Sequence, residues 1–136
     1  MVLSAEQSIK MEVKERKSAT EIKESKTEYN MLRQNLTHQM LKVFSENIDS
    51  EYPQKIFEMG KVFEEHNNSF HEKEALSVAL SPGNFTDLKQ IIEYFFRMLG
   101  LKNKINIKET ENQGKHFVEG RAGEIMFNEK TIGFLG

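Results

Sequence analysis

The side chains best suited to metal binding lie in an acidic stretch near the middle of the chain. Its two histidines, His66 and His71, are close in sequence to Glu64, Glu65 and Glu72. Imidazole and carboxylate groups bind metals, but this spacing matches no zinc or calcium pattern. An exposed, turn-prone loop also fails to hold ligands in a fixed geometry. We therefore interpret the stretch as solvated charge and predict no metal site.

Motifs for covalent or nucleotide chemistry are missing from the sequence. The chain has no Cys, which removes thiolate nucleophiles, thiolate metal sites and disulfides. It has neither a Gly-rich phosphate loop nor a nucleophile elbow, and Ser77 and Ser81 have no obvious base. We predict no catalytic and no cofactor-binding residue in this segment.

A Gly-rich segment near the C-terminal end carries a single Arg. Arg121 follows Gly120 and lies just before a predicted strand. It could contact a ligand, or it could pair with Glu119 or Glu124 to fix a loop. We favour the structural role and take Gly120, Arg121 and Glu124 as the candidate structural loop. An exposed ion pair contributes only about 0–1 kcal/mol, so this role needs a rigid geometry.

Length and charge limit the class of protein that must position these residues. A chain of 136 residues fits one domain, which we expect to span 1–136. The formal net charge of -2 gives no general attraction to a nucleic acid backbone. There is no apolar run of about 20 residues and no signal peptide pattern, so we expect a soluble, cytoplasmic protein without a membrane partner.

The stretch from residue 54 to residue 63 predicts the central strand. Phe57, Met59 and Phe63 alternate with Ile56 and Val62, so both faces are largely apolar and should be covered. Pro53 has no amide donor, so the ladder should begin near Gln54. Gly60 predicts a bulge or a close backbone approach. The polar residues 64–73 predict an exposed hairpin loop.

Two helices follow from apolar residues that recur on one face. The first should run from Leu32 to Phe44, with Gln34, His38, Gln39 and Lys42 facing outward. The second should run over residues 86–99, and its apolar stripe of Leu88, Ile91, Ile92, Phe95 and Leu99 should be core. Asn84 and Asp87 should cap its start, and Gly100 with Leu101 should close its end.

The remaining strands alternate as an antiparallel sheet requires. We predict strands over residues 75–80, 104–108, 123–127 and 131–135, the last two joined by a hairpin in which Glu129 predicts strain or a longer loop. Nearer the N-terminus, Ser4 should cap a short helix to about Met11, and residues 19–23 form a weak strand candidate. The predicted fold class is α+β, a mainly antiparallel sheet flanked by helices.

Several segments, in the same order, resemble the beta subunit of phenylalanyl-tRNA synthetase of the archaeal and eukaryotic cytosolic type. The segments are residues 27–36, 52–60, 84–89, 117–125 and 132–136. The sequence departs from the family pattern at Glu24-Ser25, where Asn-Pro is usual, and at 37–39, where a Pro-Gly turn is usual. The resemblance implies the catalytic-like module of that subunit, with a class II synthetase fold, and a fragment of a larger subunit.

This resemblance also implies a non-catalytic role beside the catalytic alpha subunit. In active class II enzymes, an Arg that holds the ATP phosphates follows the strand resembling residues 57–63, whereas this chain has Glu64 and Glu65 there. A carboxylate would repel phosphate. The parent complex resembles phenylalanine--tRNA ligase, and ATP and magnesium are expected at the partner's active site. Transfer RNA would be bound only through the whole complex.

The first helix resembles the segment that packs across a subunit interface in this family. Candidate interface residues are Leu32, Leu36, Met40 and Phe44, and ordinary core is the alternative for each. The isolated fragment could also self-associate. Two other functions stay open: a stand-alone synthetase-like binding or regulatory domain, and an RNA-binding accessory module, which the net charge disfavours.

Overall fold

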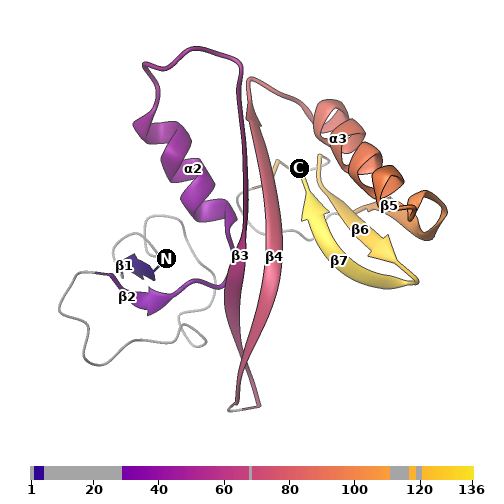
Figure 1. Cartoon of the computed structure of the whole chain (residues 1–136), viewed down its shortest axis with the longest axis horizontal. Helices are drawn as coiled ribbons and strands as arrows, with labels where there is room; N and C mark the ends of the chain where they lie inside the picture. Colours follow the sequence, from indigo (N-terminus) through magenta and orange to yellow (C-terminus); the bar gives the residue numbers. More distant parts are fainter. Residues whose placement is uncertain (1, 5–28, 68, 111–116, 119–120) are drawn as a thin grey trace. The chain divides into compact units, whose positions relative to one another are not determined.

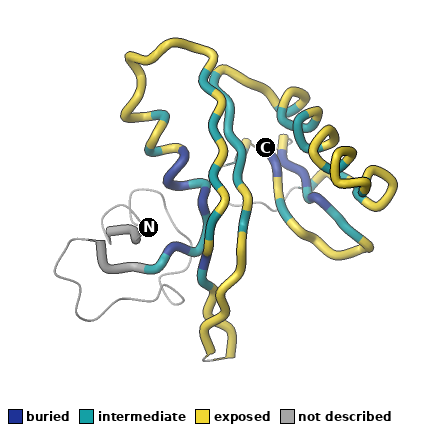
Figure 2. The backbone as a smooth tube through the Cα atoms, viewed as in Figure 1, coloured by how far each residue is buried: buried dark blue, intermediate teal, exposed yellow. Residues whose placement is uncertain are grey.

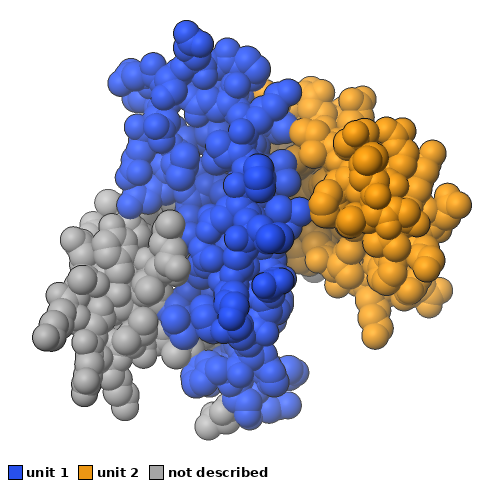
Figure 3. Space-filling view, in the orientation of Figure 1, with its two compact units in different colours: residues 1–81 blue, residues 82–136 orange. Residues whose placement is uncertain are grey.

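The computed structural model describes residues 2–4, 29–67, 69–110, 117–118 and 121–136 (Figure 1). Its buried residues fall into two groups, one between residues 33 and 62 and one between residues 122 and 135 (Figure 2). These groups correspond to two compact units, Met1–Ser81 and Pro82–Gly136 (Figure 3). That both form a single domain stays a prediction. The helix predicted from Ser4 and the weak strand at 19–23 lie outside the described residues.

The first unit contains two antiparallel strand pairs and one helix. Its elements are β1 (Val2–Ser4), β2 (Tyr29–Leu32), α2 (Thr37–Glu46), β3 (Gln54–His66) and β4 (Ser69–Ser81). β1 pairs with β2, and β3 pairs with β4.

The β3–β4 pair is a long ribbon that begins where the sequence predicts. Gln54 is the first residue of the ladder and lies opposite Ser81, and the pairing continues to His66 opposite Ser69. The predicted hairpin loop at 64–73 is therefore wrong, because these residues stay in the ladder up to a tight turn at Asn67, whose φ is 51°. Residues 64–67 and 69–73 are exposed, as predicted. Polar side chains fit a strand whose backbone groups are paired and whose faces are wet.

The two faces of the ribbon differ in burial, which corrects the prediction of a strand covered on both sides. The inner face carries Val62, which is 1% exposed. The outer face carries Phe57 and Met59, which are 77% and 72% exposed. α2 packs against β3 and β4, and among the described residues the ribbon has only two strands. One helix covers one face, so the other stays open to solvent.

Helix α2 starts five residues later than the apolar periodicity predicts. Leu32 ends β2, and the next residue is held in an extended segment by a hydrogen bond from Phe63 N to Arg33 O of 2.9 Å. His38 and Gln39, predicted to face outward, are buried, whereas Val43 is 43% exposed. The face that packs is thus rotated from the predicted one, because a polar contact described below keeps Gln39 inside.

The second unit packs one helix beside a three-stranded antiparallel sheet. Its elements are α3 (Phe85–Met98), a 3-10 turn η1 (Lys102–Lys104), β5 (Ile105–Glu109), β6 (Gly123–Phe127) and β7 (Lys130–Leu135), with strand order β5-β6-β7. The α+β class with antiparallel pairing is therefore confirmed, but the described strands form three separate sheets, not a single one. None of the described helices is long and apolar enough to span a membrane.

Both ends of α3 match the predicted caps. Asp87 N donates to Asn84 Oδ1 at 3.0 Å, which satisfies an amide of the first turn. Gly100 has a φ of 72°, and Leu101 N donates to Phe96 O at 2.8 Å while Gly100 N donates to Arg97 O at 3.0 Å. This is the Schellman closure. The stripe is less buried than predicted: Phe95 and Leu99 are 41% and 55% exposed.

The β6–β7 hairpin closes through a two-residue turn. Asn128 and Glu129 have φ values of 47° and 64°, and Phe127 pairs with Lys130. Of the two outcomes predicted for this hairpin, the structure has the strained one: Glu129 occupies a left-handed position that favours glycine.

Candidate functional site: a buried polar cluster around Arg33

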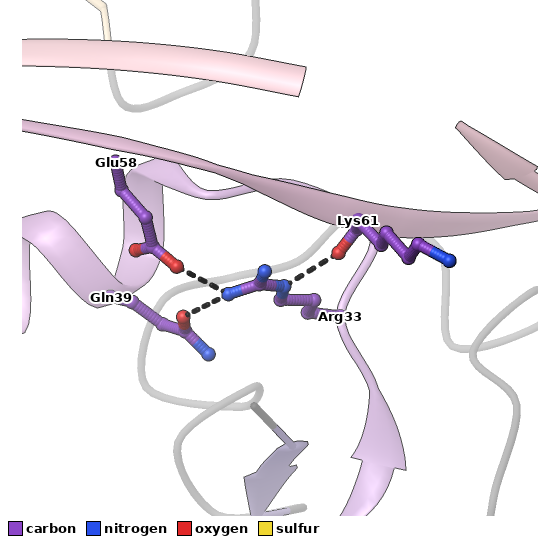
Figure 4. A network of polar contacts seen from close by, with 4 residues as sticks. All are labelled: Arg33, Gln39, Glu58 and Lys61. Atoms are coloured by element: carbon purple, nitrogen blue, oxygen red, sulfur yellow. Dashed lines mark hydrogen bonds and ion pairs between the residues drawn. The ribbon is translucent and has the colours of Figure 1, made fainter. Parts of the chain in front are cut away.

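The side chain of Arg33 lies in the interior of the first unit and is only 8% exposed. Its Nη1 is 2.5 Å from Glu58 Oε1 and donates to Gln39 Oε1 at 3.0 Å. Its Nε donates to the backbone oxygen of Lys61 at 2.7 Å. Figure 4 shows the guanidinium between the helix that carries Gln39 and the strand that carries Glu58 and Lys61.

Strand periodicity places the groups that receive Arg33. Glu58, Gly60 and Val62 are two residues apart on β3, so all three face inward. A Cβ at Gly60 would collide with Nη2 of Arg33. The ladder opposite Gly60 is regular, so there is no bulge, and the group that approaches this glycine closely is a side chain and not the backbone that was predicted. The glycine makes room for the guanidinium.

The charge of Arg33 is compensated within this cluster. A buried guanidinium is tolerated when a carboxylate and further acceptors surround it. Glu58 supplies the carboxylate, and its side chain is 29% exposed, so it keeps some contact with water. Arg33 also connects three segments, since it joins the end of β2, the first turn of α2 and the middle of β3. The cluster therefore fixes where α2 starts relative to the ribbon.

Two buried side-chain atoms of the first unit lack a hydrogen-bond partner among the described residues. They are Gln39 Nε2 and Asn35 Oδ1. Gln39 is 5% exposed, and its Oε1 is used by Arg33, so the orientation of the amide is set by the guanidinium. The Arg33 guanidinium donates to the Gln39 amide oxygen and to the backbone oxygen of Lys61, and it forms an ion pair with Glu58, so it links the helix to the strand. The cluster therefore holds these segments in place.

The residues considered for metal binding lie on the exposed part of the ribbon. His66 ends β3, and His71 lies opposite Glu64 in the ladder. Lys73 forms an ion pair with Glu64 on the same face. Within the described part of the chain, no three His, Asp or Glu side chains come together as metal ligands would.

The candidate structural loop near the C-terminal end is described only in part. Gly120 lies outside the described residues, and Arg121 is exposed, with its backbone N donating to Val118 O at 3.0 Å. Glu124 lies on β6, where it accepts from Thr131 Oγ1 at 3.1 Å. A pairing of Arg121 with Glu119 or Glu124 stays a prediction.

The candidate interface residues occupy two environments. Leu36 and Met40 are 2% and 3% exposed within this chain. Both are therefore buried in the first unit, as expected for core residues. Leu32 and Phe44 are half-buried. A contact of any of the four with a partner subunit stays a prediction.

Sequence reasoning missed the role of Arg33, although one feature pointed to it. Glu58 lies between Ile56 and Gly60 at the inward-facing positions of a strand. A carboxylate at such a position requires a cation, because burial without one is costly. The sequence alone did not identify which of 19 Lys and Arg residues supplies it.

Comparison with known proteins assigns the family. Residues 2–136 match the family described as "Phenylalanyl tRNA synthetase beta chain CLM domain". The chain is 35% identical over 113 residues to the phenylalanine--tRNA ligase beta subunit of Thermococcus kodakarensis, covering 79% of this chain and 19% of that relative. The beta subunit of Pyrococcus abyssi is 34% identical over 113 residues, with 79% and 20% covered. That of Methanosarcina barkeri is 32% identical over 107 residues, with 78% and 18% covered.

This chain thus spans about a fifth of the length of these relatives. The family match extends over both compact units and over all the strands and helices described above. The chain belongs to the phenylalanyl-tRNA synthetase beta chain family, whose CLM domain it matches.

Proposed function

We propose that this chain is the non-catalytic, class II synthetase-like core of a phenylalanyl-tRNA synthetase beta subunit. It assembles with the catalytic alpha subunit and supports the attachment of phenylalanine to tRNA in the cytoplasm. The observation that carries this proposal is the match of residues 2–136 to the CLM domain of the beta chain. ATP and magnesium belong to the active site of the alpha subunit, and tRNA is bound by the whole complex.

The charge at the end of β3 supports a non-catalytic role. Glu64 occupies the position at which the resemblance to active class II enzymes calls for an Arg that binds ATP phosphates. Glu64 is exposed, and the nearby cation Lys73 is engaged with it in an ion pair. Glu64 therefore places at this position a carboxylate, which has the same sign of charge as the phosphates, and Glu65 follows on the other face of the strand.

The Arg33 cluster supports a scaffold role. It uses buried charge to hold α2 against the ribbon, because Arg33 bonds to Gln39 on the helix and to Glu58 and Lys61 on the strand. A module whose role is to bind another subunit depends on a rigid surface and does not require reactive side chains. This cluster provides such fixation at the start of α2, beside Leu36, one of the candidate interface residues.

Two measurements test this proposal. In the first, purified chain is mixed with purified alpha subunit and assembly is followed by sedimentation velocity, with Lys89→Glu on α3 as a surface control; a stable complex is expected. In the second, phenylalanine-dependent pyrophosphate exchange is measured on the chain alone, and no exchange above background is expected. Robust exchange that is abolished by substituting a residue of this chain would overturn the proposal, as would a failure of the alpha subunit to bind.

A further inference from the structure

The outer face of the β3–β4 ribbon presents a short apolar surface. We define this surface by two adjacent rows of the ladder, Phe57 opposite Val78 and Met59 opposite Leu76. Phe57, Met59 and Leu76 are 77%, 72% and 44% exposed. Phe57 and Met59 are the two most exposed large apolar side chains of the described chain. Large exposed apolar patches mark contact surfaces, and this cluster is a small one.

The rows that bound this surface carry opposite charges. On one side lies Lys55, opposite Leu80, which gives that row a charge of +1. On the other side Lys61 lies opposite Glu74 and is 2.5 Å from Glu72. One ammonium and two carboxylates leave that end with a net charge of -1. The surface therefore has a positive end and a negative end.

A twofold axis would relate these rows of one copy to the rows of a second copy. The axis would lie in the plane of contact, perpendicular to the strands and level with Glu58. Rotation about it would place the Phe57 row of one copy against the Met59 row of the second copy. The same operation exchanges the Lys55 row with the Lys61 row. Six residues separate Lys55 from Lys61, which is about 20 Å along a strand. The positive end of each copy would then face the negative end of the other.

We propose that the outer face of the ribbon binds the same face of a second copy of this chain through this twofold arrangement. The apolar rows meet at the centre. Lys55 of each copy lies opposite Lys61 of the other, whose charge Glu72 compensates, and it reaches Glu74, one strand or about 5 Å to the side. An isologous contact needs a surface that complements itself, and a surface with opposite charges at its two ends meets that need. This self-association goes beyond the proposed function and does not depend on it.

The size of the surface predicts a weak dimer. A two-stranded ribbon is about 10 Å wide, so four rows give a footprint well below the roughly 800 Å² per partner of a standard interface. We expect a dissociation constant on the order of 100 μM. Pairing of a foreign strand with the outer edge of β3 is less favoured, because Arg33 already bonds Phe63 N and Lys61 O there.

A charge-swap experiment on the whole chain tests this proposal. Sedimentation equilibrium is measured up to about 1 mM for the wild type and for Lys55→Glu and Glu74→Lys. Each single reversal creates two repulsive contacts per dimer, so we expect about tenfold weaker association. An equimolar mixture of the two variants pairs opposite charges again and should recover wild-type affinity. The double variant K55E/E74K should recover it as well, which a folding defect would not allow.

Matched controls separate this surface from the rest of the chain. Phe57→Ser should abolish the dimer, whereas Phe70→Ser should leave it intact, because Phe70 is 57% exposed on the same face but lies beyond the four rows. Lys89→Glu on α3 should also have no effect. A monomer at all concentrations would overturn the proposal, as would a dimer that ignores the charge reversals. Binding of the alpha subunit to this face of a chain that stays monomeric would overturn it too, while leaving the proposed function intact.

Discussion

Replacing Gly60 by Ala is the sharpest test of the Arg33 cluster. The new Cβ would collide with Nη2 of Arg33, so the guanidinium must move away from its partners. Its hydrogen bonds to Glu58 and Gln39 are charge-assisted, and each such bond contributes about 1.5–3 kcal/mol. Alanine also lowers the conformational entropy of the unfolded chain, which offsets about 0.4–1 kcal/mol of this loss. We therefore expect a loss of about 2–5 kcal/mol in the stability of the first unit.

The readout should be specific to each compact unit, because the two units need not unfold together. Native-state hydrogen exchange provides this, since amides of β3 report on the first unit and amides of β6 report on the second. Gly133→Ala is the matched control: a Cβ there would contact only Ile125 Cδ1, at an ordinary 3.6 Å. Its effect should stay within about 1 kcal/mol of zero.

A double-mutant cycle identifies Arg33 as the cause. In an Arg33→Met background no guanidinium blocks the new Cβ, so Gly60→Ala should cost less than about 1 kcal/mol. Contacting residues typically show a coupling of about 0.5–3 kcal/mol. Equal costs in the two backgrounds would refute the idea that Gly60 exists to admit Arg33, and an unchanged stability in the single variant would refute the cluster itself.

Three further predictions rest on local contacts. The hydrogen bond to Glu72, and then its charge, raise the pKa of Lys61 above the ordinary 10.5; the stabilisation from this pair is therefore present below about pH 10.5 and lost as pH rises through the folded-state pKa. An NMR titration should show this, and Glu72→Gln should lower the midpoint. Asn84→Ala should cost about 1 kcal/mol by removing the acceptor for Asp87 N, whereas Asn84→Ser keeps an acceptor at the cap and should cost less, as read from exchange of α3 amides. Glu129→Gly should raise the melting temperature, because glycine relieves about 1 kcal/mol of left-handed strain.

The features that the sequence predicted well are those determined within a few residues. Helix α3 and both of its caps depend on contacts between residues three to five apart, such as that of Leu101 N with Phe96 O. The β6–β7 hairpin is equally local, and the strain at Glu129 followed from the residue type that such turns prefer.

The start of α2 was predicted wrongly because it depends on a distant strand. Periodicity extended the helix back to Leu32, but the backbone oxygen of Arg33 accepts from Phe63, thirty residues further along the chain. The same strand attracts the side chain of Arg33 and, through it, Gln39. Amphipathic spacing records which residues are apolar, whereas a buried ion pair is specified by two residues that are far apart in sequence.

The prediction of a strand covered on both sides was wrong for this chain by itself, but the pattern behind it still calls for an explanation. Full burial of a Phe or Met side chain stabilises a protein by about 1.5–3 kcal/mol. Phe57 and Met59 are mostly exposed, so they contribute little of this stabilisation. Their exposure does not contribute to folding of the first unit, so Phe57→Lys should leave the hydrogen exchange of β3 nearly unchanged. The same substitution should remove self-association. If it instead unfolds the first unit, the outer face is part of the core of the chain and is not a surface for a second copy.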